Sequence, residues 1–280
     1  FRGGKISVQQ ALGFAGLPKL GGTSGAWASV IAYTMALTWL FLHLHRTGNP
    51  LALNRALLKH LWIDPKLLKA LLRIGLPSGL QMIMVSLSEI AVISFVNRFG
   101  SNATAAYGAV NQVVSYVQFP AISVSIAASI FGAQAIGSGN PERLTRIART
   151  AATLSLIIVG LLVVAAYSFS RSIVGWFIDN PETIEIAHRL LMITLWSYLV
   201  FGTSVVLSGV MRSSGTVLWP TTISIFSIWG IEVPVAYWLS YRVGLDGIWI
   251  GYPAAFVGGL LLQACYFHFV WRRKTHARLI

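Results

Sequence analysis

Long apolar runs separated by short polar connections dominate the chain. A transmembrane helix needs about 20 predominantly apolar residues, and about seven runs reach or exceed that length. They are Ala26–Leu44, Ile74–Val96, Ala105–Ile136, Ala151–Ile178, Ile186–Met211, Thr221–Tyr241 and Ile248–Val270. The sequence therefore predicts an all-α polytopic membrane protein with about seven transmembrane helices.

The composition agrees with a lipid environment. Hydrophobic residues make up 55% of the chain and charged residues 10%, and the mean hydropathy is +0.70, whereas a soluble domain carries about 25% charged residues. The net charge of +13 comes from basic residues between the apolar runs, not from one polar face as in a nucleic-acid-binding protein. We therefore expect the lipid bilayer, and no nucleic acid, as a partner.

The distribution of basic residues predicts the orientation. The polar segment His45–Arg73 holds six of them, and the positive-inside rule assigns it to the cytoplasm. If successive connections between the helices lie on alternate sides of the membrane, 14 of the 21 Lys and Arg fall on the cytoplasmic side and five on the opposite side. This predicts a multi-pass protein of the cell (inner) membrane with a cytoplasmic C-terminus.

An internal repeat predicts the organisation of the chain. Gly22-Thr-Ser-Gly25-Ala-Trp27 precedes the first run and Gly244-Leu-Asp-Gly247-Ile-Trp249 the last, both reading G-x-x-G-x-W. Same-orientation repeats are a known plan of membrane transporters. We expect residues 1–46 to end an N-terminal lobe, 47–66 to form a cytoplasmic linker, and 67–280 to form a C-terminal six-helix lobe. The remainder of the N-terminal lobe of the same polypeptide is then a further partner.

Two carboxylates lie inside apolar runs. Glu89 is in the middle of the second run, and Glu232 is at the centre of the sixth, just before Pro234. A charge in the membrane core costs about 2.5–3.5 kcal/mol and therefore suggests a function. Either carboxyl group could exchange a proton or an alkali cation. Alternatively, it could be protonated and stabilise the packing by a hydrogen bond to a neighbouring helix. At Glu232 the alternative is a hydrogen bond to backbone freed by the proline.

Polar and aromatic side chains at helical spacing suggest a substrate cleft. Met82 and Ser86 share a stripe with Glu89, and the third run carries the stripes Asn111–Ser115–Gln118 and Gln112–Tyr116. Aromatic rings of the fifth run could hold a flat organic cation. The predicted cleft residues are Met82, Ser86, Asn111, Gln112, Ser115, Tyr116, Trp196, Tyr198 and Ser204. The alternative is hydrogen bonding between packed helices, worth about 0.6 kcal/mol each.

The inventory of motifs excludes the usual enzymes. There is no H-E-x-x-H, G-x-S-x-G or P-loop in the sequence. His43 and His45 are two residues apart and point to different faces of a helix, and a single cysteine, Cys265, excludes cysteine-based metal clusters. The segment Gly137-Ser-Gly139-Asn-Pro is predicted to be a helix-ending turn. No catalytic residue, metal or cofactor is predicted beyond a coupling ion, H⁺ or Na⁺.

Several segments, in order along nearly the whole chain, resemble one transporter family. They are Gly16–Gly21, Ile74–Gln81, Phe119–Pro120, Ala127–Glu142, Gly209–Gly215, Pro234–Tyr237 and Gly244–Trp249. They are similar to the loop before the sixth helix and to parts of helices seven to twelve of multidrug and toxic compound extrusion (MATE) transporters. The resemblance implies a twelve-helix, two-lobed antiporter that exports amphipathic, often cationic compounds in exchange for H⁺ or Na⁺.

The resemblance also bears on the site. Glu89 falls where the family commonly places a carboxylate of the C-terminal cation site. The acid that sodium-coupled members carry on the tenth helix is absent, because Tyr198–Ser208 holds none, and this favours a proton. Two alternatives stay open: a lipid-linked oligosaccharide flippase of the same superfamily, which needs a strongly cationic cleft, and a non-transporting membrane scaffold.

Overall fold

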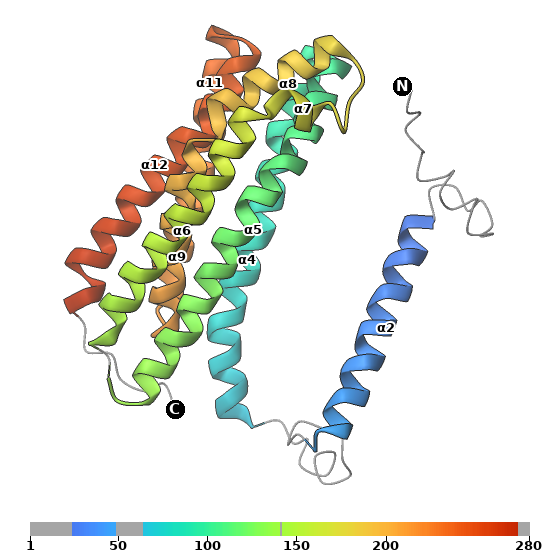
Figure 1. Cartoon of the computed structure of the whole chain (residues 1–280). Coiled ribbons are helices and arrows are strands. Elements are labelled where there is room, and N and C mark those ends of the chain that lie inside the picture. Colours follow the sequence, from blue (N-terminus) through green and yellow to red (C-terminus); the bar gives the residue numbers. More distant parts are fainter. Residues whose placement is uncertain (1–23, 49–63, 141, 274–280) are drawn as a thin grey trace. The chain divides into compact units, whose positions relative to one another are not determined.

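A computed structural model describes residues 24–48, 64–140 and 142–273, and the described part is helical throughout its regular structure (Figure 1). The α-helices are α2 (Ser24–Arg46), α4 (Pro65–Val96), α5 (Ser101–Gly137), α6 (Arg143–Ser168), α7 (Ser170–Val174), α8 (Pro181–Thr194), α9 (Ser197–Ser213), α10 (Leu218–Phe226), α11 (Val233–Arg242) and α12 (Leu245–Phe269). Shorter helical turns are η2 (Asn97–Phe99) and η4 (Trp271–Arg273), and the π-helix η3 (Ser227–Glu232) joins α10 to α11. Six described helices are long and apolar enough to cross a membrane, or seven with α8 and α9 as one bent span. The predicted all-α membrane fold is confirmed.

The chain divides into two compact units, Phe1–Leu68 and Lys69–Ile280. The first contributes α2, whose described side chains are almost all exposed. Three predicted features lie partly or wholly outside the described residues. These are the start of the first G-x-x-G-x-W repeat, most of the 47–66 linker, and the end of the basic tail.

The core of the second unit is built around α5, which packs against α6, α8 and α9, while α12 packs against α9 and α11. The residues at the α5–α9 crossing are small, as is usual where membrane helices approach closely. Ser125 of α5 donates a hydrogen bond to the Val205 carbonyl of α9 at 2.7 Å. A Cβ added at Gly209 would lie 2.6 Å from the Ser125 carbonyl oxygen. The lack of a side chain at Gly209 therefore permits this crossing.

The fifth apolar run, predicted as one span, consists of two helices in the structure. It is divided into α8 and α9, which meet at 50°. The Tyr167 hydroxyl donates to the Met192 carbonyl at 3.3 Å and accepts from the Trp196 amide at 3.0 Å. These two backbone groups would otherwise bond each other in a continuous helix, and a side chain inserted at such a position bends the helix. Tyr167 is far away in sequence, so the run alone could not reveal the break.

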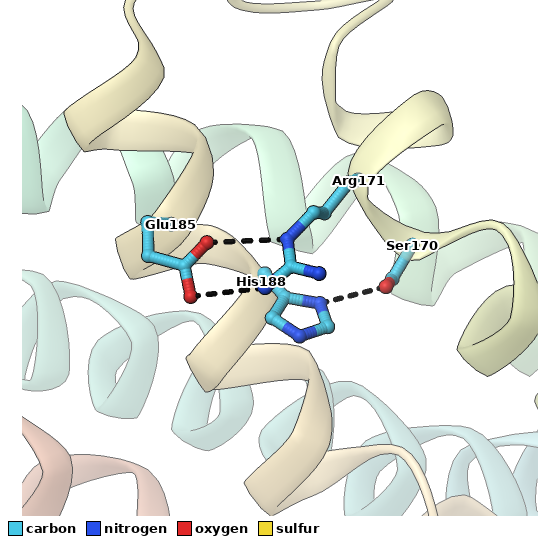
Figure 2. A network of polar contacts seen from close by, with 4 residues as sticks. All are labelled: Ser170, Arg171, Glu185 and His188. Carbon is cyan, nitrogen blue, oxygen red and sulfur yellow. Dashed lines mark hydrogen bonds and ion pairs between the residues drawn. The ribbon is translucent and has the colours of Figure 1, made fainter.

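The fourth run also ends earlier than predicted, since α6 stops at Ser168 and α7 is a separate short helix. Figure 2 shows how α7 is attached to α8. The hydroxyl of Ser170 is 2.7 Å from Nδ1 of His188, and Arg171 makes a two-pronged ion pair with Glu185 at 3.2 and 3.3 Å. The side chains of that ion pair are more than half exposed, so we attribute little stability to it.

The turn after α5 is confirmed as a helix-ending motif. Gly139 has a positive φ of 78°, and the Asn140 amide bonds the Ala135 carbonyl at 2.9 Å while the Gly139 amide bonds that of Ile136 at 3.1 Å. This pair of bonds defines a Schellman motif. The Gly-rich segment therefore terminates a helix and is not a phosphate cradle.

Trp271 packs the end of α12 against the rest of the second unit. Its side chain is 1% exposed, stacks on Phe267 at 4.9 Å, and donates from Nε1 to the Ser214 hydroxyl after α9 at 2.8 Å. Replacing a buried Trp with Ala costs about 3–5 kcal/mol. We expect Trp271→Ala to lower the thermal unfolding midpoint of the purified protein clearly, whereas Trp176→Ala, at a side chain 74% exposed, should leave it nearly unchanged. Equal shifts in the two variants would contradict this role.

Candidate functional site

A cavity of about 390 Å³ lies within the second unit, among α4, α5, α9, α10, η3 and α12. Its lining mixes apolar side chains with carboxyl, hydroxyl, amide and guanidinium groups. The polar lining residues are Gln81, Ser88, Glu89, Gln118, Ser125, Ser204, Ser208, Arg212, Ser224, Ser227, Glu232, Tyr252 and Gln263. Such a mixture is typical of a ligand site, because a packed membrane core would be filled with apolar side chains.

The two intramembrane carboxylates both line this cavity. Glu89 is presented by α4, and Glu232, only 5% exposed, is presented by η3. Glu89 is exposed, whereas Glu232 is buried. Two carboxylates that line one cavity repel each other, and a proton or a cation relieves the repulsion. The structure thus brings both carboxylates to the lining of one cavity.

Glu232 is positioned by an irregular helix. It is the last residue of the π-helix η3, and Pro234, which has no amide hydrogen, follows two residues later. Gly251 of α12 allows the close approach: a Cβ added there would lie 3.0 Å from the Glu232 carbonyl oxygen. Single π-helical turns occur frequently at functional sites because they displace side chains from the regular helical register.

The helix α4 forms one wall of the cavity and makes few close backbone approaches to other described helices. Side chains bridge the gap instead. The Trp229 Nε1 donates to the Met84 carbonyl at 3.2 Å, and Arg212 donates from Nη2 to the Gln81 Oε1 at 2.6 Å. The cavity lies beside the part of α4 from Gln81 to Glu89, whereas Val92 and Val96 farther along the helix are buried in the core.

Aromatic residues close the part of the cavity near Tyr252. The hydroxyl of Tyr252 is 3.0 Å from that of Tyr107. Phe201 and Phe256 line the cavity, and Tyr198 packs against both rings at 6.0 and 5.3 Å. Tyr198 thus lies behind the aromatic wall, buried, rather than on its surface.

The structure brings together three of the predicted site residues: Glu89, Glu232 and Ser204 line one cavity. The other predicted positions lie outside it. Met82, Ser86, Asn111, Gln112, Tyr116 and Trp196 are exposed, Ser115 is half-buried and donates to the Asn111 carbonyl of its own helix, and Tyr198 is buried.

Several lining residues were not predicted as site residues. Arg212, for example, lies in the last turn of α9 and lines the cavity. On α12, Tyr252, Phe256, Gly259 and Gln263 follow one another at spacings of four, three and four residues. That periodicity places them on one helical face. The glutamine on this face of an apolar run was the feature of the sequence that could have indicated a polar site.

Among the described residues no group of three or more His, Cys, Asp and Glu could hold a metal ion.

The fold and the cavity together define a multi-pass helical membrane protein with an ionisable site inside its second unit. The sequence model of the MatE family matches residues 77–238, which is more than half of the chain. The chain belongs to the MatE family. This is a family of transporters and not of enzymes.

Two relatives from Bacillus subtilis (strain 168) illustrate the similarity. The chain is 53% identical to "Probable multidrug resistance protein YoeA" over 96% of this chain and 58% of the relative. It is 24% identical to "Probable multidrug resistance protein YpnP" over 91% of this chain and 56% of that relative. The chain thus spans somewhat more than half the length of the curated relatives it matches.

A solved structure supports the fold. A point mutant of the MATE transporter VcmN of Vibrio cholerae superimposes with a TM-score of 0.77 at 18% identity, covering 91% of this chain and 57% of VcmN. At this identity the likeness establishes the fold alone. The membrane architecture and the family that the sequence predicted are confirmed.

Proposed function

We propose that the chain supplies the C-terminal lobe, residues 67–280, and the last N-terminal-lobe helix, within residues 1–46, of a two-lobed secondary transporter. Residues 47–66 would link the lobes. The transporter exports amphipathic or cationic organic compounds in exchange for H⁺ or Na⁺. The observation that carries the proposal is that Glu89 and Glu232 line one polar cavity inside a membrane lobe. The names of the relatives, which describe multidrug resistance proteins, support the substrate class.

The coupling step follows from the carboxylates. When a proton or cation neutralises the pair, their repulsion disappears and the cavity tolerates a less polar content. When the ion leaves, the negative pair attracts an organic cation. Occupancy by the ion and by the organic cation are therefore alternatives, as exchange transport requires. The absence of an acid in Tyr198–Ser208 favours a proton as the coupling ion.

A second group of residues is proposed to line the cleft toward the other lobe. Met82 and Ser86 on α4, and Asn111, Gln112 and Tyr116 on α5, have exposed side chains in the described unit. Exposed amide and phenol groups in the middle of a transmembrane run are costly in lipid. A cleft facing the second lobe gives them a polar surrounding. We place the protein in the cell (inner) membrane with a cytoplasmic C-terminus, on the distribution of basic residues.

The test is ethidium efflux from cells that produce the complete two-lobed polypeptide, compared with cells carrying the empty vector. We expect dye to leave at least several-fold faster with the transporter, and the difference to vanish when an ionophore discharges the proton gradient. Efflux that instead follows the sodium gradient would assign Na⁺ as the coupling ion. A protein that moves neither ethidium nor other organic cations would contradict the proposal and favour the flippase or the scaffold. A reconstituted lipid-scrambling assay separates those two.

A further inference from the structure

Arg212 is a half-buried cation that lines the cavity, and the proposed coupling mechanism does not use it. It lies in the last turn of α9 and lines the cavity. One guanidinium nitrogen, Nη2, donates to Gln81 Oε1, but Nε is buried without a hydrogen-bond partner among the described residues. Neither of the ion pairs in the described part of the chain, Arg171–Glu185 and Arg189–Asp246, includes it.

A second unsatisfied group lines the same cavity. Gln263 of α12 is 2% exposed, and its Nε2 donates weakly to the Ser224 hydroxyl at 3.5 Å. Its Oε1 is buried without a partner in the described residues. Buried polar groups in native proteins are almost always hydrogen-bonded, so two exceptions in one cavity need an explanation. A ligand that brings both an anionic acceptor and a donor would satisfy them.

The cavity has opposite charges at its two ends. Gln81, which is bonded to Arg212, and Glu89 are eight residues apart on α4, which corresponds to about 12 Å of helical rise. The carboxylates of Glu89 and Glu232 thus mark one end and the guanidinium of Arg212 the other. An amphipathic cation complements only the first end and leaves Nε of Arg212 without a hydrogen-bond partner among the described residues.

We propose that Arg212 is a substrate-binding residue that holds the carboxylate of zwitterionic organic solutes, while their cationic group lies at Glu89 and Glu232. This assignment rests on the proposed export function and specifies its substrates. A guanidinium binds a carboxylate through a planar fork of N–H donors, which Nε can complete. Gln263 lies on the same cavity surface and offers a carbonyl acceptor to a donor group of the solute.

The test uses two dyes that differ in a single group. Rhodamine 110 carries a free carboxylate and is a zwitterion at neutral pH, whereas rhodamine 123 is its methyl ester and is a cation. Binding of each dye to the purified full-length protein is measured by fluorescence polarisation, and efflux of each from cells is measured separately. We expect Arg212→Gln to weaken rhodamine 110 binding at least tenfold and to change rhodamine 123 binding less than twofold.

Two further variants sharpen the comparison. Arg212→Lys keeps the charge but not the planar fork and should show an intermediate loss for rhodamine 110. Arg149→Gln, at an exposed position of α6 outside the cavity, should bind both dyes like the wild type. The proposal is overturned if Arg212→Gln weakens both dyes equally, if it weakens neither, or if the wild type does not bind rhodamine 110. Binding that depends on Arg212 without efflux of either dye would remove the proposed export function and leave the binding assignment intact.

Discussion

Cells that produce the Glu89→Gln variant of the two-lobed protein should lose ethidium efflux almost completely, by at least tenfold at matched abundance in the membrane. Glutamine keeps the size and hydrogen-bonding capacity of a protonated glutamate but cannot release a proton or bind a cation. The variant is therefore fixed in the neutral state and cannot exchange an ion for a solute. The measurement is the initial efflux rate from preloaded cells, with membrane abundance determined on the same samples.

Two comparisons make this prediction specific. Glu142→Gln changes an exposed carboxylate at the N-terminal end of α6 and should leave efflux unchanged. Glu232→Gln, in the same cavity as Glu89, should also abolish efflux if both carboxylates share the ion. If Glu232 instead supports the backbone before Pro234, the variant should transport normally but unfold at a lower temperature. Wild-type efflux by Glu89→Gln would show that this carboxylate is a packing group.

Replacing Gly209 with Leu should prevent the second unit from folding. The α-carbon of Gly209 faces Ser125 so closely that even a Cβ would lie 2.6 Å from the Ser125 carbonyl oxygen, which belongs to helix backbone and cannot turn aside. Overpacking of a core normally costs 1–3 kcal/mol. Here α5 and α9 would have to separate along their whole crossing, and we expect a loss of more than about 5 kcal/mol.

The expected observation is loss of a monodisperse peak for Gly209→Leu when detergent extracts are separated by fluorescence-detected size exclusion. Gly108→Leu is the matched control, because a Cβ added at Gly108 on α5 meets no atom within 4 Å. It should also gain a little helix propensity, since glycine is about 1 kcal/mol less favourable than the best helix formers. If both variants elute like the wild type, the close α5–α9 crossing does not determine the fold.

The sequence predicted the membrane spans well because burial in lipid is a property of each helix alone. A run of about 20 apolar residues is recognisable without knowledge of its neighbours. The breaks could not be predicted in the same way. The bend between α8 and α9 depends on the hydroxyl of Tyr167, which belongs to another helix, and the early end of α6 accompanies contacts of Ser170 and Arg171 with α8.

The candidate site was predictable in part for a related reason. Glu89 and Glu232 are conspicuous because a charged group in an apolar run is costly wherever the run packs. The positions of uncharged polar residues were not decided by sequence, since a hydroxyl or amide is tolerated on a cavity wall, at a helix contact or at the surface. Helical spacing shows which residues of one helix share a face. Only the packing of the helices shows which of these faces line the cavity. Ser204 faces the cavity, whereas Tyr198, on the same helix, is buried behind Phe201 and Phe256.

The loose attachment of α4 has an energetic consequence. Val92 and Val96 near the end of α4 are buried in the core, but beside the cavity the helix is held by side-chain hydrogen bonds such as Trp229 to Met84 and Arg212 to Gln81. Each of these bonds can be broken for roughly 1–3 kcal/mol. One elementary charge that crosses a potential of 100 mV releases about 2.3 kcal/mol. The two quantities are of the same order, so under the proposed coupling one ion entering along the membrane field could break such a bond and move this part of α4. The rest of the second unit, whose helices cross closely, can remain rigid while α4 moves.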